Sequence, residues 1–294
     1  MRRFGVVHWA RRQQSVDRQT RACLHQGLGS GSSPWGWSPG PAQPGHEGPA
    51  DHVGSRASAY AVPVSNIGVL REGPLHAAVK AMLERPGDRL EVPIGRFVID
   101  LVRADGELVE VQTGGFAPLG PKLDALLDEH RFRIVHPVAA ERRIVRVDED
   151  GEITSIRRSP RKAGAVDVFD KLVAFPSLLM HPHLTVEVLL LREDHVRGRR
   201  AARTGRRTRD PGVRRLVDVV NRVELRGPKD VVTMLPALPL GPFSTRELAT
   251  VLKCNVLLAQ RAAYCLRTIG IIEAAGNRGR TPLHRRRLSA AITG

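Results

Sequence analysis

The sequence predicts a mixed α/β fold of the α+β kind, in which a helix, three strands, a second helix and a fourth strand precede a smaller helical domain. Three observations lead to this prediction. Between residues 73 and 138 the spacing of apolar residues changes from helical to alternating and back, with Gly or Pro near the changes. Two apolar runs in this region meet at the turn sequence Ala104-Asp105-Gly106. Near the C-terminus, Ser244 and Asn255 can cap two successive helices.

The composition favours a protein that binds a polyanion. With 294 residues, of which 41% are hydrophobic and 26% charged, the chain can bury one or two domains. Its net charge of +16 makes nucleic acid the natural partner. Cys23, Cys254 and Cys265 lack CxxC spacing, which argues against a disulfide scaffold or a zinc site. The N-terminal region also lacks the apolar run of a secretory signal or membrane span, so we expect a cytoplasmic protein without a membrane partner.

Residues 1–68 are expected to form a disordered tail. They contain all three tryptophans among many Gly, Pro, Ser and Gln residues, with no sustained apolar period. A segment of this composition buries too little apolar surface to offset the entropy of ordering it. We therefore expect the first folded domain to cover residues 69–195.

The first helix is expected to begin at Pro74, which suits a first helical turn, and to end before Pro86 and Gly87. The apolar residues that share one face of this helix are Leu75, Val79, Met82 and Leu83. Residues 89–94 follow as a strand that leads into a hairpin.

The hairpin over residues 96–112 can be closed in two registers, and the choice decides whether it holds a site. A two-residue loop, Asp105-Gly106, would put the carboxylates of Asp100 and Glu110 on opposite faces of the sheet. Neither face would then be uniformly apolar. A one-residue shift of this kind moves every side chain of a strand to the other face.

We prefer a three-residue loop, Ala104 to Gly106, in which Gly106 supplies the positive φ. This register pairs Arg103 with Glu107 and Asp100 with Glu110, and it leaves one wholly apolar face. That face carries Phe97, Ile99, Leu101, Val109 and Val111. Two carboxylates directly opposite each other on a half-buried surface repel unless a cation lies between them. The pair therefore predicts a site for Mg²⁺ or Mn²⁺, both of which prefer oxygen ligands.

After the hairpin, a second helix is expected to begin at Pro118 or Pro121, and residues 131–138 read as a buried strand. Further elements are expected as a hairpin over residues 142–157, a helix near residues 166–174 and a strand over residues 185–191. His181 and His183 precede the last strand without an acidic or thiol partner in register, which favours an ordinary loop over a metal site.

This order of elements, with Asp100 on the second strand and Glu110-Val111-Gln112 on the third, resembles the PD-(D/E)xK nuclease superfamily, which has the restriction-endonuclease-like fold. The resemblance covers residues 73–138, with additions to about residue 193. It implies Mg²⁺-dependent hydrolysis of phosphodiester bonds, with Asp100 and Glu110 as metal-binding carboxylates. The whole chain is also similar to an uncharacterised bacterial family that joins such a domain to a winged helix.

Gln112 departs from the superfamily pattern, because it stands where a Lys is usual. A Gln amide can orient water but brings no positive charge to the transition state. The resemblance implies that the cation can come instead from the following helix, where Lys122 stands. It also implies a third acidic ligand near the first helix, for which Glu72 and, less favourably, Glu84 are the candidates.

Two other interpretations of the hairpin stay open. The polar side chains can belong to an ordinary solvated sheet face, as in many antiparallel sheets. The domain can also be a degenerate nuclease fold that binds nucleic acid without cutting it, an option that Gln112 strengthens. The position of Lys122 relative to Asp100 and Glu110 separates the catalytic interpretation from the binding one.

Residues 196–215 are rich in Arg and are expected to form a basic linker. The linker is either a solvated spacer or an arm that follows phosphate groups without reading sequence. Residues 216–294 are then expected to form the C-terminal domain.

In this C-terminal domain, two short helices precede a longer one, and a basic two-stranded hairpin follows. Ser244 and Glu247 form a capping box for the second helix, and Asn255 caps the third. This order resembles a winged-helix domain. The resemblance implies base contacts from Gln260, Arg261 and Arg267, and wing contacts from Arg278, Arg280, Arg285, Arg286 and Arg287. Because winged helices also mediate protein contacts, that interpretation stays open, as does a homodimer.

Overall fold

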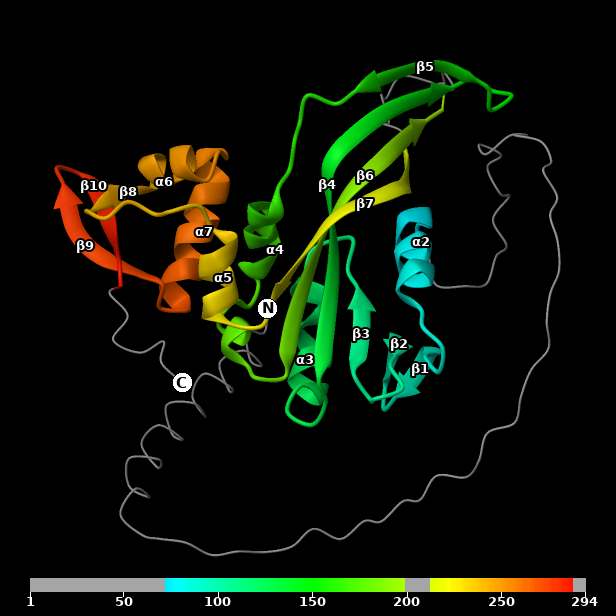
Figure 1. The fold of residues 1–294 in the computed structure, drawn as a ribbon, viewed down its shortest axis with the longest axis horizontal. Helices are drawn as coiled ribbons and strands as arrows, with labels where there is room; N and C mark the ends of the chain where they lie inside the picture. The colour runs from blue at the N-terminus through cyan, green and yellow to red at the C-terminus, as the bar shows by residue number, and fades with distance from the viewer. Residues whose placement is uncertain (1–71, 199–211, 288–294) are drawn as a thin grey trace, which may run out of the picture.

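A long mixed β-sheet forms the centre of the protein (Figure 1). The computed structural model describes residues 72–198 and 212–287, so the predicted tail and most of the predicted linker lie outside the described residues. Six strands follow the order β1, β2, β3, β4, β6 and β7, and β5 pairs with the second half of β4. Their bounds are β1 Arg89–Ile94, β2 Phe97–Val102, β3 Leu108–Val111, β4 Phe132–Val147, β5 Ile153–Arg158, β6 Leu184–Arg197 and β7 Val213–Leu225.

The strand directions follow from the connections between strands. β1, β2 and β3 form an antiparallel meander, whereas β3 with β4 and β4 with β6 are parallel pairs. Parallel neighbours need a crossover that returns the chain to the starting edge. The first crossover contains η1 (Ala117–Leu119) and α3 (Gly120–Leu126), and the second contains η2 (Ala165–Val168), α4 (Phe169–Leu172) and η3 (Pro176–Met180).

Helices cover both faces of the sheet. On one face α2 (Pro74–Leu83) buries Leu75, Val79 and Leu83 against β2, β3, β4 and β6. On the other face the two crossovers pack over Val102 and Leu108, which are 4% and 1% exposed. The alternative of an ordinary solvated sheet face is therefore wrong here, because the β3-to-β4 crossover lies over that face.

The predicted three-residue loop of the central hairpin is confirmed, but the predicted single apolar face is wrong, because Ile99 packs with the crossovers whereas Leu101 packs with α2. Leu101 lies opposite Val109 and Val102 opposite Leu108, so the loop has three residues. The N–H of Arg103 donates to the Glu107 carbonyl at 2.9 Å, and Gly106 has φ 83°. Gly106 is thus in the left-handed region that favours glycine.

The expected ion pair between Arg103 and Glu107 does not form. The Arg103 guanidinium, which is 7% exposed, turns toward the end of α2. There it donates to the Leu83 carbonyl at 2.7 Å and pairs with Asp88. Glu107 accepts from Arg133 of β4 at 3.2 Å instead. Both side chains prefer partners on neighbouring elements because each is largely buried, where an unpaired charge is costly.

The C-terminal part contains α5 (Pro228–Met234), β8 (Phe243–Ser244), α6 (Thr245–Val251), α7 (Val256–Thr268), β9 (Ile272–Arg278) and β10 (Thr281–Arg286). The Ser244 hydroxyl accepts from Glu247 N at 3.2 Å and the Glu247 carboxylate accepts from Ser244 N at 2.6 Å, which confirms the capping box. Asn255 accepts from Leu258 N at 2.8 Å. A short strand that we did not predict, β8, joins β10 to make a three-stranded sheet.

The predicted boundary between linker and C-terminal domain at residues 215 and 216 is wrong. It falls inside β7, which pairs with β6 along the edge of the central sheet. The boundary lies after Leu225, where α5 begins the second unit. We missed β7 because its Arg residues extend the basic composition of the preceding segment, whereas the strand's partner is supplied by distant sequence.

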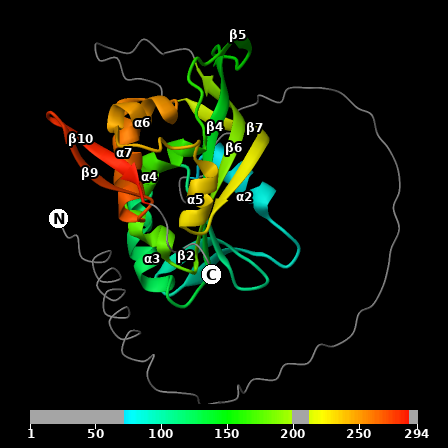
Figure 2. The same ribbon diagram turned by 60° about the vertical axis from the view of Figure 1, so that its left-hand side comes forward.

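The C-terminal helices share an apolar core with the crossovers of the sheet. Phe169 and Leu172 of α4 belong to the same buried cluster as Leu258, Ala259 and Ala262 of α7. Figures 1 and 2 both show α7 beside α4. Among the described residues, no helix is both long and apolar enough to span a membrane.

Replacing Gly106 with Ala tests the hairpin loop. A left-handed φ costs an L-residue about 1–2 kcal/mol, so we expect Gly106→Ala to lower the free energy of unfolding by about that amount in chemical denaturation. Gly115→Ala is the matched control, because Gly115 lies in the next loop without a positive φ, and at both positions a new Cβ meets no atom within 4 Å. Equal effects of the two substitutions would contradict the assigned loop.

Candidate active site

Asp100 and Glu110 meet across the central hairpin. The N–H of Val111 donates to Asp100 Oδ2 at 2.8 Å, and the N–H of Asp100 donates to Glu110 Oε1 at 3.3 Å. Each carboxylate therefore accepts a backbone N–H from the opposite strand, just beyond the last regular pair of the hairpin, Leu101 with Val109. The two acidic groups are locked in place by the strands that carry them.

Lys122 of α3 neutralises Glu110. Its Nζ lies 2.5 Å from Glu110 Oε1 and donates to the Val98 carbonyl at 2.8 Å. The two side chains are 15% and 8% exposed. Burial raises the pKa of Glu110, and the nearby charge of Asp100 raises it further, whereas Lys122 acts in the opposite direction. Glu110 is thus a carboxylate whose ionisation depends on a cation beside it.

Asp100 is held by a different basic side chain on the other face of the sheet. His76 Nε2 of α2 lies 3.0 Å from Asp100 Oδ2. Burial alone would raise the pKa of Asp100, but the hydrogen bonds from His76 and from Val111 N–H outweigh it and lower that pKa. For His76, burial opposes protonation, but the bond to Asp100 prevails and raises the imidazole pKa. The two carboxylates of the pair consequently differ in acidity.

One face of α2 carries the charges that support Asp100. Glu72 Oε1 lies 3.5 Å from His76 Nε2 and 2.9 Å from Lys80 Nζ, and Lys80 also reaches Glu91 at 2.7 Å. We did not predict His76 or Lys80 as site residues. The signal was present, because Glu72, His76 and Lys80 recur every four residues and so share one face of a helix.

The remaining predicted residues of the site lie away from the carboxylate pair. The Glu72 carboxylate accepts a hydrogen bond from Lys80, and Glu84 is an exposed residue at the end of α2. Gln112 donates through its side-chain amide to the Gly115 carbonyl at 2.5 Å, in the loop that follows β3. Lys122, not Gln112, is therefore the polar side chain that reaches Glu110.

Asp100 and Glu110 are two candidate ligands for a divalent ion. Within residues 72–198 and 212–287, no three His, Cys, Asp or Glu side chains form a metal-binding group, so Glu72 does not complete a triad. Asp100 and Glu110 each direct one oxygen at a protein donor and have a second carboxylate oxygen as a potential ligand. Mg²⁺ is often bound by one or two carboxylates, with water and substrate phosphate as the other ligands. The donor set therefore fits Mg²⁺ or Mn²⁺.

The predicted nucleic-acid contacts fall into two groups. Arg261 of α7 pairs with Asp170 of α4 between the two units, and its side chain is 38% exposed. Gln260 and Arg267 of α7 are exposed. In and after the hairpin of β9 and β10, Arg278 pairs with Glu247 at 3.1 Å, and Arg285 and Arg287 lie 2.7 Å and 3.6 Å from Glu273. Arg280 and Arg286 are exposed.

Replacing Lys122 with Met tests the electrostatic balance of the pair. Removing one partner of a buried ion pair leaves an uncompensated charge, so we expect a loss on the order of 3 kcal/mol in the free energy of unfolding at neutral pH. Adding Glu110→Gln should recover most of this loss, because a neutral amide does not repel Asp100. Lys162→Met, at an exposed position, is the control. If both Lys substitutions have the same effect, Lys122 does not stabilise the pair.

Comparison with known proteins gives a family for the chain. The domain of unknown function DUF8091 matches residues 73–226, which run from just before α2 to just after β7. An uncharacterized protein of Treponema pallidum (strain Nichols) is 30% identical over 226 residues, covering 75% of this chain and 87% of that protein. No solved structure matches the chain. By the extent of these two matches, the chain belongs to the family defined by DUF8091.

Proposed function

We propose that the protein is a DNA-binding nuclease that hydrolyses phosphodiester bonds with the help of Mg²⁺ or Mn²⁺. One observation carries the proposal: Asp100 and Glu110 meet across a hairpin, and the Lys122 ammonium lies 2.5 Å from Glu110. Two carboxylates and a cation at one point are suited to binding a metal ion and a phosphate group together.

The arrangement of elements supports a restriction-endonuclease-like core. A helix, an antiparallel three-stranded meander and a helical crossover to a parallel strand follow one another, with α2 and α3 on opposite faces of the sheet. This agrees with the αβββαβ order of the PD-(D/E)xK superfamily, which the sequence resembles. Asp100 and Glu110 lie on the second and third strands, as that resemblance requires.

The side chains of the site have distinct roles in the proposed reaction. Asp100 and Glu110 would hold the ion, which when bound polarises a phosphoryl oxygen and lowers the pKa of a water ligand. Lys122 supplies positive charge where negative charge develops on the phosphate, the task that Gln112 cannot perform. His76 is a positioning residue that keeps Asp100 ionised and fixed in orientation.

A second candidate function is DNA binding without cleavage. The observation in its favour is Gln112, which lacks the charge of the usual Lys and turns its amide toward Gly115. On this alternative the fold is a degenerate nuclease that acts as a regulator or adaptor. The proximity of Lys122 to Glu110 leads us to prefer hydrolysis.

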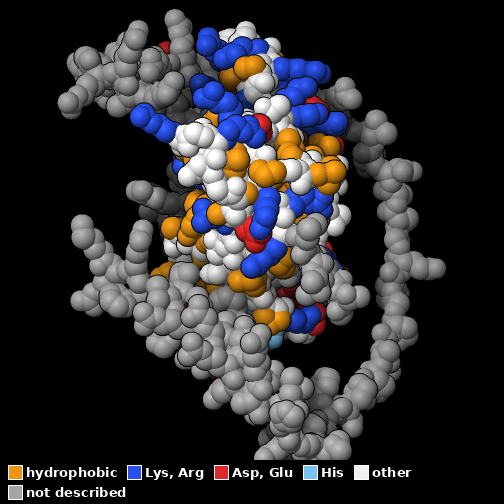
Figure 3. Space-filling view, turned by 90° about the vertical axis from the view of Figure 1, so that its left-hand side faces the viewer, with side chains coloured by type: hydrophobic (Ala, Val, Ile, Leu, Met, Phe, Trp, Pro, Cys, Tyr) orange, Lys and Arg blue, Asp and Glu red, His pale blue; other side chains and the backbone are white. Residues whose placement is uncertain are grey.

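We also propose that the C-terminal unit is a winged helix that contacts DNA mainly through its wing. Figure 3 shows a face of the molecule on which Lys and Arg side chains far outnumber acidic ones. Arg280 lies at the turn between β9 and β10, and Arg286 lies near the end of β10. These residues take the DNA-contact role that we expected for Arg261, because Arg261 forms an ion pair with Asp170 of α4.

The test is cleavage of plasmid and single-stranded DNA by the purified protein with Mg²⁺, Mn²⁺ or EDTA. We expect cleavage only with a divalent ion, and its loss in Asp100→Asn and Glu110→Gln. Lys122→Met should lower the rate by about 10²–10³-fold, the usual effect of removing one group that stabilises transition-state charge.

Glu149→Gln is the matched control for these substitutions, because Glu149 is an exposed acid in the turn between β4 and β5. It should leave the cleavage rate unchanged. DNA binding without divalent-dependent cleavage would reject hydrolysis and favour the non-catalytic alternative. Cleavage that survives Asp100→Asn would show that the carboxylate pair is not the active site.

A further inference from the structure

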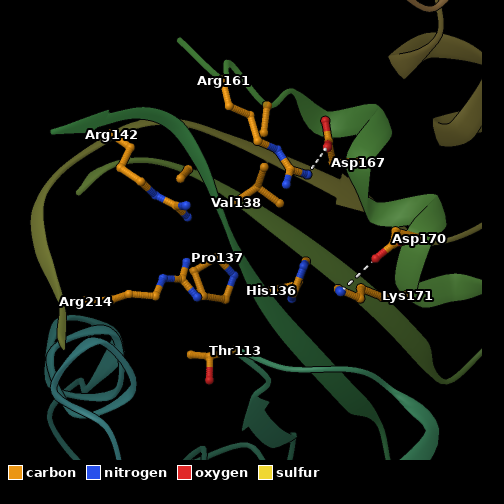
Figure 4. A pocket seen from close by; sticks show the side chains of 12 residues that line it. Thr113, His136, Pro137, Val138, Arg142, Arg161, Asp167, Asp170, Lys171 and Arg214 are labelled. Carbon is orange, nitrogen blue, oxygen red and sulfur yellow. Dashed lines mark hydrogen bonds and ion pairs between the residues drawn. The ribbon is translucent and has the colours of Figure 1, made fainter. Parts of the chain in front are cut away.

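A second group of charged side chains lines a cleft beside the carboxyl end of β3. The cleft measures about 160 Å³ and is bounded by β4, α4, the start of β7 and the segment before η2 (Figure 4). Its cationic lining residues come from all four of these segments: Arg142, Arg161, Lys171 and Arg214. No part of the proposed hydrolytic mechanism uses them.

The cleft lies next to the proposed active site and on the same face of the sheet as Glu110. Glu110 is the parallel partner of Ile134, and His136 follows two residues later on the same face of β4. The His136 ring bonds through Nδ1 to the Gln112 carbonyl at 2.6 Å and forms part of the cleft lining, as does Thr113. Thr113 follows Glu110 by three residues, so the two residues are at most about 10 Å apart.

A buried carboxylate fixes two of the guanidinium groups. Glu193, whose side chain is 0% exposed, accepts from Arg142 Nε at 2.5 Å and from Arg214 Nε and Nη2 at 3.0 Å and 2.7 Å. A guanidinium has five N–H donors, so both groups retain donors for a ligand. Figure 4 shows Arg142 and Arg214 reaching toward each other over Pro137.

Cations outnumber acids around the cleft. Asp167 faces Arg161 at 3.5 Å, and Asp170 pairs with Lys171 at 2.8 Å and also with Arg261. Together with Glu193, three carboxylates thus meet five cationic side chains. His136 adds no charge near neutral pH, because burial lowers its pKa to about 4. The remaining positive charge and the free guanidinium donors suit a phosphate group, which Arg binds with two parallel hydrogen bonds.

The size of the cleft limits the ligand to a small group. Pockets for drug-sized ligands measure roughly 300–1,000 Å³, which is larger than this cleft. A phosphate attached to a longer chain fits these limits better than an entire nucleotide.

We propose that the cleft is a phosphate-binding subsite that holds a backbone phosphate of the DNA strand cleaved at Asp100 and Glu110. The identity of the strand rests on the proposed function, whereas phosphate binding in the cleft does not. The subsite would position the DNA relative to the carboxylate pair, because two fixed points on one strand set its direction and register.

The test measures the affinity of a fluorescent DNA duplex as a function of salt, in EDTA so that no cleavage occurs. Each phosphate contact contributes about −0.9 to the slope of log affinity against log salt, so the Arg161→Gln, Lys171→Gln double variant should reduce the magnitude of the slope by up to about 0.9, the contribution of the one phosphate held in the cleft. Arg85→Gln with Arg89→Gln, two exposed cations beside β1, should leave the slope unchanged.

A third variant tests the cleft independently, in case the first cleft variant fails to fold. Arg142→Gln with Glu193→Gln removes a cation and its buried partner together, so Arg214 keeps a hydrogen-bond acceptor. This variant should also reduce the magnitude of the salt slope. If both cleft variants match the Arg85 and Arg89 control, the proposal is overturned.

Competition separates the two sources of phosphate. Suppose that inorganic phosphate or adenosine monophosphate binds the wild type but not the Arg161, Lys171 variant, while the two proteins bind DNA with equal affinity. That result would assign the cleft to a free ligand and reject the DNA subsite. The assay also separates this inference from hydrolysis. If the cleft variants reduce the salt slope as expected but the wild type shows no divalent-dependent cleavage, the active site is rejected and the subsite is retained.

Discussion

Two carboxylates that face each other across a tight hairpin impose the main constraint on this structure. The three-residue loop sets the register that brings Asp100 and Glu110 together, where their charges repel. The protein offsets this repulsion with one basic partner for each acid, from helices on opposite faces of the sheet: His76 of α2 and Lys122 of α3. The positions of both helices are therefore coupled to the chemistry of the hairpin.

The rest of the fold holds these helices in place and excludes water from both faces of the sheet. Because both faces of the sheet are covered, the pair lies where charges interact strongly, and a divalent ion would replace repulsion with attraction. The C-terminal unit packs α7 on α4, and α4 supplies one wall of the basic cleft. On the proposed function, a DNA strand would meet both the cleft and the carboxylate pair.

The sequence was sufficient for features that depend on local signals. Pro74 begins α2, Gly106 closes the hairpin and Ser244 caps α6, as predicted, because each signal acts within a few residues. Predictions failed where the deciding partner is distant in sequence. Arg103 pairs with Asp88 instead of Glu107, and Arg261 pairs with Asp170 of α4, a contact that the sequence of α7 alone does not indicate. In the site, local pattern placed the two carboxylates, but tertiary packing determined that Lys122 reaches Glu110 and that Gln112 and Glu72 do not join the pair.

Anomalous diffraction from crystals soaked in Mn²⁺ would test the central claim most directly, because it locates the ion without relying on activity. The account predicts an anomalous peak bound by both Asp100 and Glu110, with the remaining ligands supplied by water or a bound phosphate. A peak elsewhere, or no peak between Asp100 and Glu110 at saturating Mn²⁺, would contradict the assignment of the pair as a metal site.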